Sequence, residues 1–149
     1  MAFGRYLEEF TIGEVIKHDK TKTILESDNN LFSLLTMNHH PVHLDVEFCK
    51  HHQYGKILVV GTLVFSLIVG ITVSDISGKA IANLDYERIE HKGPVFIADT
   101  LRAETEVLDV RQSKSKSDRG IIYVETRAFN QNNEEVLRFR RHVLIPKKV

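Results

Sequence analysis

Apolar and polar residues alternate through the second half of the chain with the period of two that is typical of β-strands. Between residues 100 and 111, Leu101, Ala103, Thr105 and Val107 fall on one face and charged side chains fall mostly on the other. The expected strands are residues 80–91, 100–111, 121–129 and 135–145. Short polar connections, KSKSDRG at 114–120 and NQNNE after residue 129, separate the last three, so they predict antiparallel hairpins.

Residues 57–73 form a long apolar run without a charge. Its length is at the lower limit for a membrane span, so a membrane helix and a helix buried inside a domain are both open. We favour the buried helix, starting near residue 58 and ending near Gly78, because the run contains small and hydroxyl-bearing residues and lacks a flanking lysine or arginine bias. These residues are Gly61, Thr62, Ser66, Gly70 and Thr72.

Shorter elements are expected before this run. Residues 9–24 suggest one or two short strands, interrupted at Gly13. Residues 26–36 predict a helix with Ser27 or Asp28 as its cap. Pro41 then stops any helix, and residues 45–52 predict one or two further turns capped by Asp45.

The order of elements predicts an α+β fold in which one antiparallel sheet curls around one long helix. A helix wrapped in this way must be apolar nearly all round. The chain of 149 residues is the size of one domain, so we expect residues 1–149 to form a single domain.

Charge and cysteine content narrow the class of protein. Twenty basic and 20 acidic residues give a net charge of zero, and no basic block points to nucleic acid. Cys49 is the only cysteine, which excludes an internal disulfide and fits a reducing compartment. The first ten residues lack the features of a signal or transit peptide. We therefore expect a cytoplasmic protein with no membrane or nucleic-acid partner.

Three segments in this order resemble the MaoC-like dehydratases: HHPVHLD at 39–45, VVGTLVFSLIVG at 59–70 and GPVFIADTLRAETEVLDVR at 93–111. These are hot-dog proteins similar to R-specific enoyl-CoA hydratases. DNNLFSLLTMNHHPVHLD and SDISGKAIANLDY are closest to the branch acting on mesaconyl-CoA or itaconyl-CoA. The resemblance implies a hot-dog fold, a homodimer with its sheets joined edge to edge, and an acyl-CoA substrate with coenzyme A as part of it. It implies no separate cofactor and no metal.

The family signature, Asp-any-Asn-Pro-any-His, falls on residues 38–43. His43 then matches the catalytic histidine, whereas Asn38 stands in place of the catalytic aspartate and His40 in place of the asparagine. Gly61 matches the glycine whose N–H binds the thioester oxygen. The resemblance therefore implies His43, Asn38 and Gly61 as catalytic residues, and neighbouring residues as substrate-binding. These neighbours are His40, Pro41, Val60 and Thr62.

Hydration of a double bond conjugated to a thioester needs a base for water and donors for the developing enolate oxygen. An imidazole at His43 suits the first task, and an unpaired N–H at a helix start suits the second. Asn38 cannot take a proton, but its amide oxygen can orient water. The spacing from Asn38 to His43 suggests a loop that turns both side chains toward one pocket.

Each feature also has a simpler interpretation. Five histidines between residues 39 and 52 raise the alternative of a metal site, without a supporting motif. Gly61 can be a packing glycine, Cys49 a small apolar filler, and Arg138 and Arg140 a solvated outer face instead of a grip on coenzyme A phosphates. The function expected is an enoyl-CoA hydro-lyase. An acyl-CoA thioesterase and a non-catalytic acyl-CoA binding protein are the alternatives.

Overall fold

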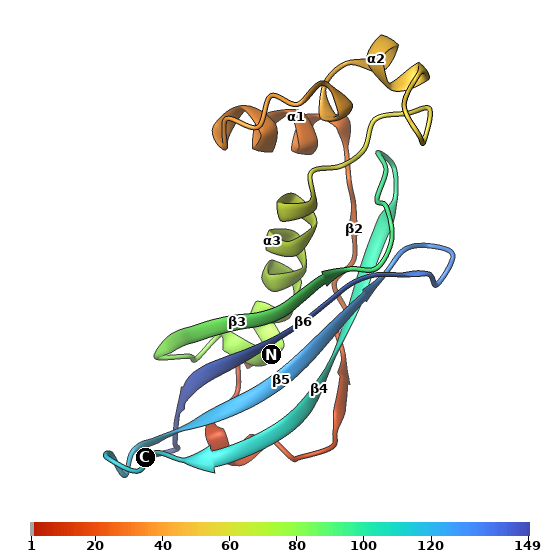
Figure 1. The fold of residues 1–149 in the computed structure, drawn as a ribbon. Coiled ribbons are helices and arrows are strands. Elements are labelled where there is room, and N and C mark those ends of the chain that lie inside the picture. The colour runs from red at the N-terminus through yellow and green to blue at the C-terminus, as the bar shows by residue number, and fades with distance from the viewer. Residues whose placement is uncertain (1) are drawn as a thin grey trace.

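A computed structural model describes residues 2–149, and it places one antiparallel sheet against one central helix, α3 (Figure 1). The strand order is β1-β4-β5-β6-β3, and β2 also pairs with β4. The strands are β1 (Val15–Lys17), β2 (Lys22–Thr23), β3 (Ala82–His91), β4 (Thr100–Gln112), β5 (Arg119–Phe129) and β6 (Glu135–Pro146). The α+β architecture, the two short early strands and the four later strands predicted from the sequence are confirmed.

The alternation in β4 sets the inner face of the sheet. Leu101, Ala103, Thr105 and Val107 are all buried there, as their spacing predicted. Leu101 and Ala103 pack with residues of α3, among which Ile68 is fully buried, and Val107 packs in a second cluster with Ile76, just after the helix. Burial of this apolar surface is the main stabilising contribution to such a fold.

The central helix α3 (Gly61–Thr72) begins three residues later than the apolar run suggested. Residues 58–60 are extended, because Leu58 forms a bridge with Phe96 and the amide of Val59 donates to the carbonyl of Val95. A single π-helical turn (Val73–Ser77) continues α3 up to Gly78. Within residues 2–149, no helix has the length and apolar character needed to cross a membrane.

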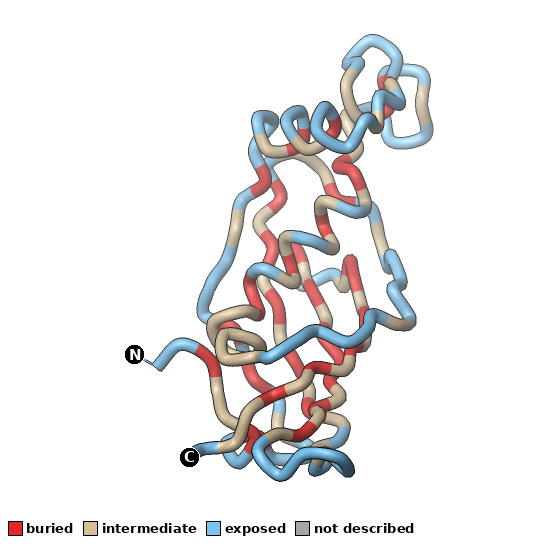
Figure 2. Tube along the Cα trace, turned by 90° about the vertical axis from the view of Figure 1, so that its left-hand side faces the viewer, coloured by how far each residue is buried: buried red, intermediate tan, exposed pale blue. Residues whose placement is uncertain are grey.

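The sheet does not enclose α3 completely (Figure 2). Thr62, Ser66 and Gly70 lie four residues apart, so they share one face of the helix, and that face is exposed. The expectation of a helix covered nearly all round is therefore wrong for this stripe. The sheet covers the faces that carry Val64, Ile68 and Ile71.

The short helices α1 (Glu26–Leu35) and α2 (Val46–Lys50), with a 3₁₀ turn between them (Pro41–His43), project beyond the sheet next to the start of α3 (Figure 1). We call residues 26–50 the overhang. Asp45 caps α2 as predicted, because its carboxylate accepts from the amide of Phe48. The cap of α1 differs: Leu25 is the N-cap, and Asp28 reaches back from the first turn to accept from its amide.

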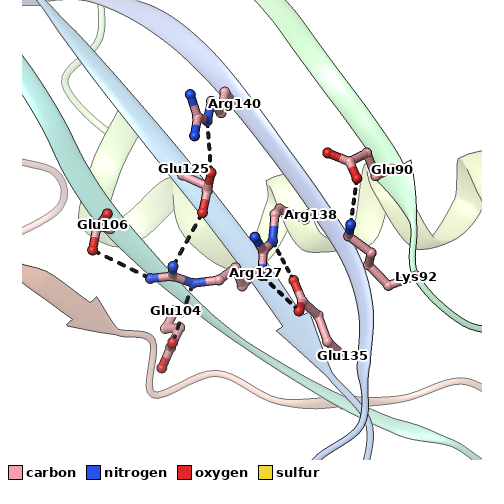
Figure 3. A network of polar contacts seen from close by, with 9 residues as sticks. All are labelled: Glu90, Lys92, Glu104, Glu106, Glu125, Arg127, Glu135, Arg138 and Arg140. Carbon is pink, nitrogen blue, oxygen red and sulfur yellow. Dashed lines mark hydrogen bonds and ion pairs between the residues drawn. The ribbon is translucent and has the colours of Figure 1, made fainter.

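Strand β6 carries arginines on both faces. Arg138 and Arg140 lie on the face turned away from α3, where Arg138 pairs with Glu135 and Arg140 with Glu125 (Figure 3). Arg127 of β5 joins the same network through Glu104, Glu106 and Glu125 (Figure 3). This agrees with an outer, charged face for Arg138 and Arg140, and these guanidinium groups are already paired with carboxylates.

The sequence pattern did not predict the burial of Arg141 but did predict that of Cys49. Arg141 is only 2% exposed, and it donates to Asn83 Oδ1 and to Thr72 Oγ1 at the carboxyl end of α3, where the helix dipole favours a cation. Cys49 is fully buried, as expected of an apolar filler.

His18 belongs to a buried polar chain beside the end of α3. Its Nδ1 lies 2.7 Å from Asp75 Oδ2 and its Nε2 lies 2.7 Å from Thr105 Oγ1. Thr105 Oγ1 in turn lies 2.9 Å from Thr126 Oγ1. Desolvation lowers the pKa of His18 below its ordinary value near 6.5, and the bond with Asp75 opposes this effect only in part.

The lowered pKa of His18 predicts acid-sensitive stability. The unfolded chain takes up a proton near pH 6.5, where the folded chain keeps His18 neutral, so the free energy of unfolding falls as the pH decreases below about 6.5. Chemical denaturation between pH 5.5 and 7.5 measures this slope. His18→Asn is expected to flatten it, whereas His39→Asn, at an exposed position, is expected to leave it unchanged. Equal slopes for His18→Asn and the unmodified chain would contradict the assignment.

Candidate active site

His43 lies at the end of the 3₁₀ turn in the overhang, directly after Pro41 and Val42. Pro41 suits the first position of this turn, because it has no N–H to satisfy. The Nδ1 of His40, the N-cap, accepts from the amide of Val42 and closes the turn. The local sequence therefore holds the backbone of His43 in one conformation.

The imidazole of His43 is fixed in one tautomer. Its Nδ1 lies 2.6 Å from the carbonyl oxygen of Leu58, and since a carbonyl can only accept, Nδ1 carries the proton. The second nitrogen, Nε2, is then left with a lone pair. His43 can thus act as a base through Nε2 while its ring orientation is held by the main chain.

Asn29 of α1 connects the segment of His43 to the start of α3. Its Nδ2 donates to the carbonyl oxygen of His43 over 3.1 Å, and its Oδ1 accepts from the amide of Val60 over 3.0 Å. Asn29 is only 1% exposed. One buried amide therefore sets the position of His43 relative to the first turn of the central helix.

A cavity of about 480 Å³ lies between the overhang, the start of α3 and the connection from β3 to β4. This volume is in the range of ligand pockets. His43 and Gly61 both line it, so the structure brings these two predicted residues together. The other lining residues are Tyr54, Leu58, Val59, Val64, His91, Lys92, Gly93, Pro94 and Val95.

Gly61 supplies an unpaired donor at the cavity. It is the first residue of α3, and within residues 2–149 no backbone or side-chain acceptor bonds to its N–H. A Cβ at this position would lie 2.9 Å from His91 Cε1 and 3.0 Å from His91 Nε2. A side chain at this position would force the ring of His91 to move, and glycine is also suited to the approach of a ligand to the backbone.

The remaining predicted residues lie around the cavity without lining it. Asn38 is partly buried, and its Oδ1 accepts from the amide of His40 over 3.4 Å, so the spacing argument that turned it toward the pocket of His43 does not hold in this structure. The ring of His40 meets that of His43 edge-on at 6.1 Å. Pro41 shapes the turn, Val60 bonds to Asn29, and Thr62 is exposed beside Gly61.

His91, Lys92 and Tyr54 line the cavity and were missed by the sequence analysis. The order of elements alone indicates the position of His91 and Lys92. Because β3 follows α3 and runs back along it, the last residues of β3 must lie near the first residues of α3. His91, at the end of the strand predicted for residues 80–91, and the adjacent Lys92 could have been placed near Gly61 by this argument, although the sequence analysis did not do so.

The histidines between residues 39 and 52 do not form a metal cluster among the described residues. The group with suitable spacing is Asp85, Glu87 and His142, on the outer face of β3 and β6. Asp85 already accepts from the amide and the Nδ1 of His142, and Glu87 accepts from the hydroxyl of Tyr123. These bonds account for the cluster, and we assign no metal to it.

The buried bridge of Asn29 predicts a large local effect on stability. Asn29→Ala leaves the carbonyl of His43 and the amide of Val60 without partners, at about 1–3 kcal/mol for each group, and is expected to lower the free energy of unfolding by about 2–4 kcal/mol. Asn30→Ala is the matched control, because Asn30 is exposed on the same helix, and a change within about 0.5 kcal/mol is expected. Urea denaturation compares them, and similar losses for both variants would contradict the role of the bridge.

The sequence model of the family described as "MaoC like domain" matches residues 8–128. Over 145 residues, or 97% of this chain, it is 34% identical to a mesaconyl-CoA hydratase of Cereibacter sphaeroides. Over the same share it is 32% identical to a beta-methylmalyl-CoA dehydratase of Chloroflexus aurantiacus. The chain covers only 42% and 41% of these two proteins, so it spans about two fifths of the curated relatives it matches.

Solved structures share the fold. A monoamine oxidase regulatory protein from Archaeoglobus superposes with a TM-score of 0.85 at 32% identity, covering 100% of this chain and 99% of the other. A MaoC domain protein from Chloroflexus aurantiacus gives 0.93 at 32% identity, covering 98% and 41%. A Mycobacterium tuberculosis protein with a double hot-dog fold gives 0.86 at 20% identity, covering 97% and 45%. The expected hot-dog fold is confirmed, and the chain belongs to the MaoC-like dehydratase family.

Proposed function

We propose that this protein is a hydro-lyase that adds water to, or removes it from, the double bond of an enoyl-CoA thioester, with a short branched or dicarboxylic acyl group. The observation that carries the proposal is that the free Nε2 of His43 and the unpaired N–H of Gly61 belong to residues lining one cavity. The relatives named mesaconyl-CoA hydratase and beta-methylmalyl-CoA dehydratase support the choice of substrate class.

In the proposed reaction, the thioester oxygen accepts a hydrogen bond from the N–H of Gly61. The amino end of α3 stabilises the negative charge that develops on this oxygen. His43 Nε2 takes a proton from water, and the hydroxide oxygen forms a bond to the β-carbon as the double bond shifts toward the thioester. The imidazolium of His43 then returns the proton to the α-carbon, so water is added without any net redox change.

A single base fits the observed site better than an acid–base pair. The family aspartate is replaced by Asn38, and Asn38 bonds to the loop backbone instead of lining the cavity. Within residues 2–149, no carboxylate lines this cavity. The same observation disfavours a thioesterase that activates water with a carboxylate. The resemblance implies catalysis for Asn38 and substrate binding for His40, Pro41, Val60 and Thr62, and we keep them as proposed site residues beside the cavity, which none of them lines.

We further propose a homodimer in which two copies pair along β3. This strand is an edge of the sheet, and its apolar side chains are exposed, a combination that a second strand would cover. The exposed residues of β3 are Leu84, Tyr86 and Ile89, and Ile81, directly before the strand, is exposed as well. The chain covers 45% of a protein with a double hot-dog fold, so two copies supply the two units of such a fold.

His43→Ala tests the catalytic proposal. Loss of the base is expected to reduce hydration of mesaconyl-CoA and crotonyl-CoA by about 100-fold or more. The assay follows the absorbance of the enoyl thioester together with release of free thiol. Hydration removes the absorbance without thiol, a thioesterase releases thiol, and a binding protein does neither. Activity of His43→Ala within tenfold of the unmodified chain would show that His43 is not the base.

Charged substitutions on β3 test the dimer. Leu84→Lys with Ile89→Lys places two cations on the exposed edge, and a shift from dimer to monomer is expected because strand pairing would bury them. Sedimentation equilibrium measures the mass. Ile12→Lys serves as control, since Ile12 is exposed outside β3. A monomeric unmodified chain, or a dimer that survives both β3 substitutions, would argue against this interface.

A further inference from the structure

The charge of the cavity is one-sided. His43, His91 and Lys92 line it, and within residues 2–149 no aspartate or glutamate does so. Its other walls are mostly apolar, from Leu58, Val59, Val64, Pro94 and Val95. Of these three side chains, the proposed mechanism uses only His43, and it assigns no role to His91 or Lys92.

His91 is placed to contact whatever binds at Gly61. It is the last residue of β3, and its ring atoms Cε1 and Nε2 lie 2.9 and 3.0 Å from the position that a Cβ on Gly61 would take. A substituent of an acyl group whose carbonyl is held by the N–H of Gly61 is therefore close to this ring. The imidazole is exposed, and no hydrogen bond to it is formed by any group of residues 2–149.

Lys92 differs from His91 because it already has a partner. Its Nζ lies 2.5 Å from Glu90 Oε2, and both side chains are partly exposed. Glu90 therefore offsets much of the charge of Lys92, which leaves His91 as the unpaired donor. We therefore expect Lys92 to attract an anionic ligand to the mouth of the cavity through its positive charge and not through a direct hydrogen bond.

We propose that His91, assisted by Lys92, binds the free carboxylate of a dicarboxylic enoyl-CoA and thereby selects it over a monocarboxylic one. This inference rests on the proposed function and names the residue that distinguishes dicarboxylic from monocarboxylic acyl groups. A protonated imidazole donates a charge-assisted hydrogen bond to a carboxylate. An acyl chain that ends in a methyl group would shield the imidazole from water without accepting a hydrogen bond from it, and this weakens binding.

Two substrates that differ only at this point give the sharpest test. Mesaconyl-CoA with its thioester next to the methyl-bearing carbon becomes tiglyl-CoA when the free carboxylate is replaced by a methyl group. The change between variants in the ratio of kcat/KM for mesaconyl-CoA to that for tiglyl-CoA isolates recognition of the carboxylate, because the intrinsic difference in reactivity between the two thioesters cancels. We expect the unmodified chain to favour mesaconyl-CoA by about tenfold or more, the size of effect of a charged hydrogen bond.

His91→Phe keeps a planar ring beside Gly61 and removes both ring nitrogens, and it is expected to lower this ratio by about tenfold or more. His91→Gln keeps an N–H donor without the charge, and an intermediate ratio is expected. It also provides the measurement if the phenylalanine variant does not fold. Lys92→Met is expected to lower the ratio by a smaller factor. His51→Phe, at an exposed position that does not line the cavity, is the matched control and should not change the ratio.

The inference would be overturned by an unmodified chain that does not prefer mesaconyl-CoA, or by His91 variants that lower kcat/KM for both substrates by the same factor. In either case hydration itself would still be observed and the proposed function would stand. If neither thioester lost its double bond, the proposed function would fail, and the role of His91 would fail with it.

Discussion

The amide of Asn29 is the interaction on which the geometry of the site depends. It bonds to the carbonyl of His43 and to the amide of Val60, two backbone segments that are otherwise joined by a long connection through α2. The bond to Val60 is buried and the bond to His43 is partly buried, and an unsatisfied buried partner is costly, so separation of the two segments would lower the stability. A second tie between the same segments, from His43 Nδ1 to Leu58, also fixes the tautomer of the ring.

The two ends of α3 differ in whether their polar groups have partners within the protein. The amino end faces the cavity, where Gly61 keeps its N–H unpaired and His91 lies against its α-carbon. The carboxyl end bonds to protein groups: Arg141 donates to Thr72, and Asp75 of the π-helical turn bonds to His18. The end that carries partial positive charge is thus left for a ligand, and the end that carries partial negative charge is satisfied internally.

Alternation in residues 100–145 was sufficient to predict the sheet, because one of its faces is buried and the other is charged. The start of α3 was placed too early because residues 58–60 are apolar in an extended segment as well, and hydropathy does not distinguish the two conformations. Local patterns also could not show that Asn38 would bond to its own loop, that Arg141 would be buried, or that His91 would reach Gly61. The bond of Asn38 is a local choice among several loop conformations. The burial of Arg141 and the position of His91 depend on contacts between segments distant in sequence, which only the packed fold determines.

Both chain ends lie at the opposite end of the molecule from the overhang (Figures 1 and 2). A tether or affinity handle joined to either terminus would therefore extend away from the mouth of the cavity. Two copies could be linked in tandem through these ends while each mouth stayed open to reactants. The scaffold is for this reason well suited to fusion and to surface immobilisation.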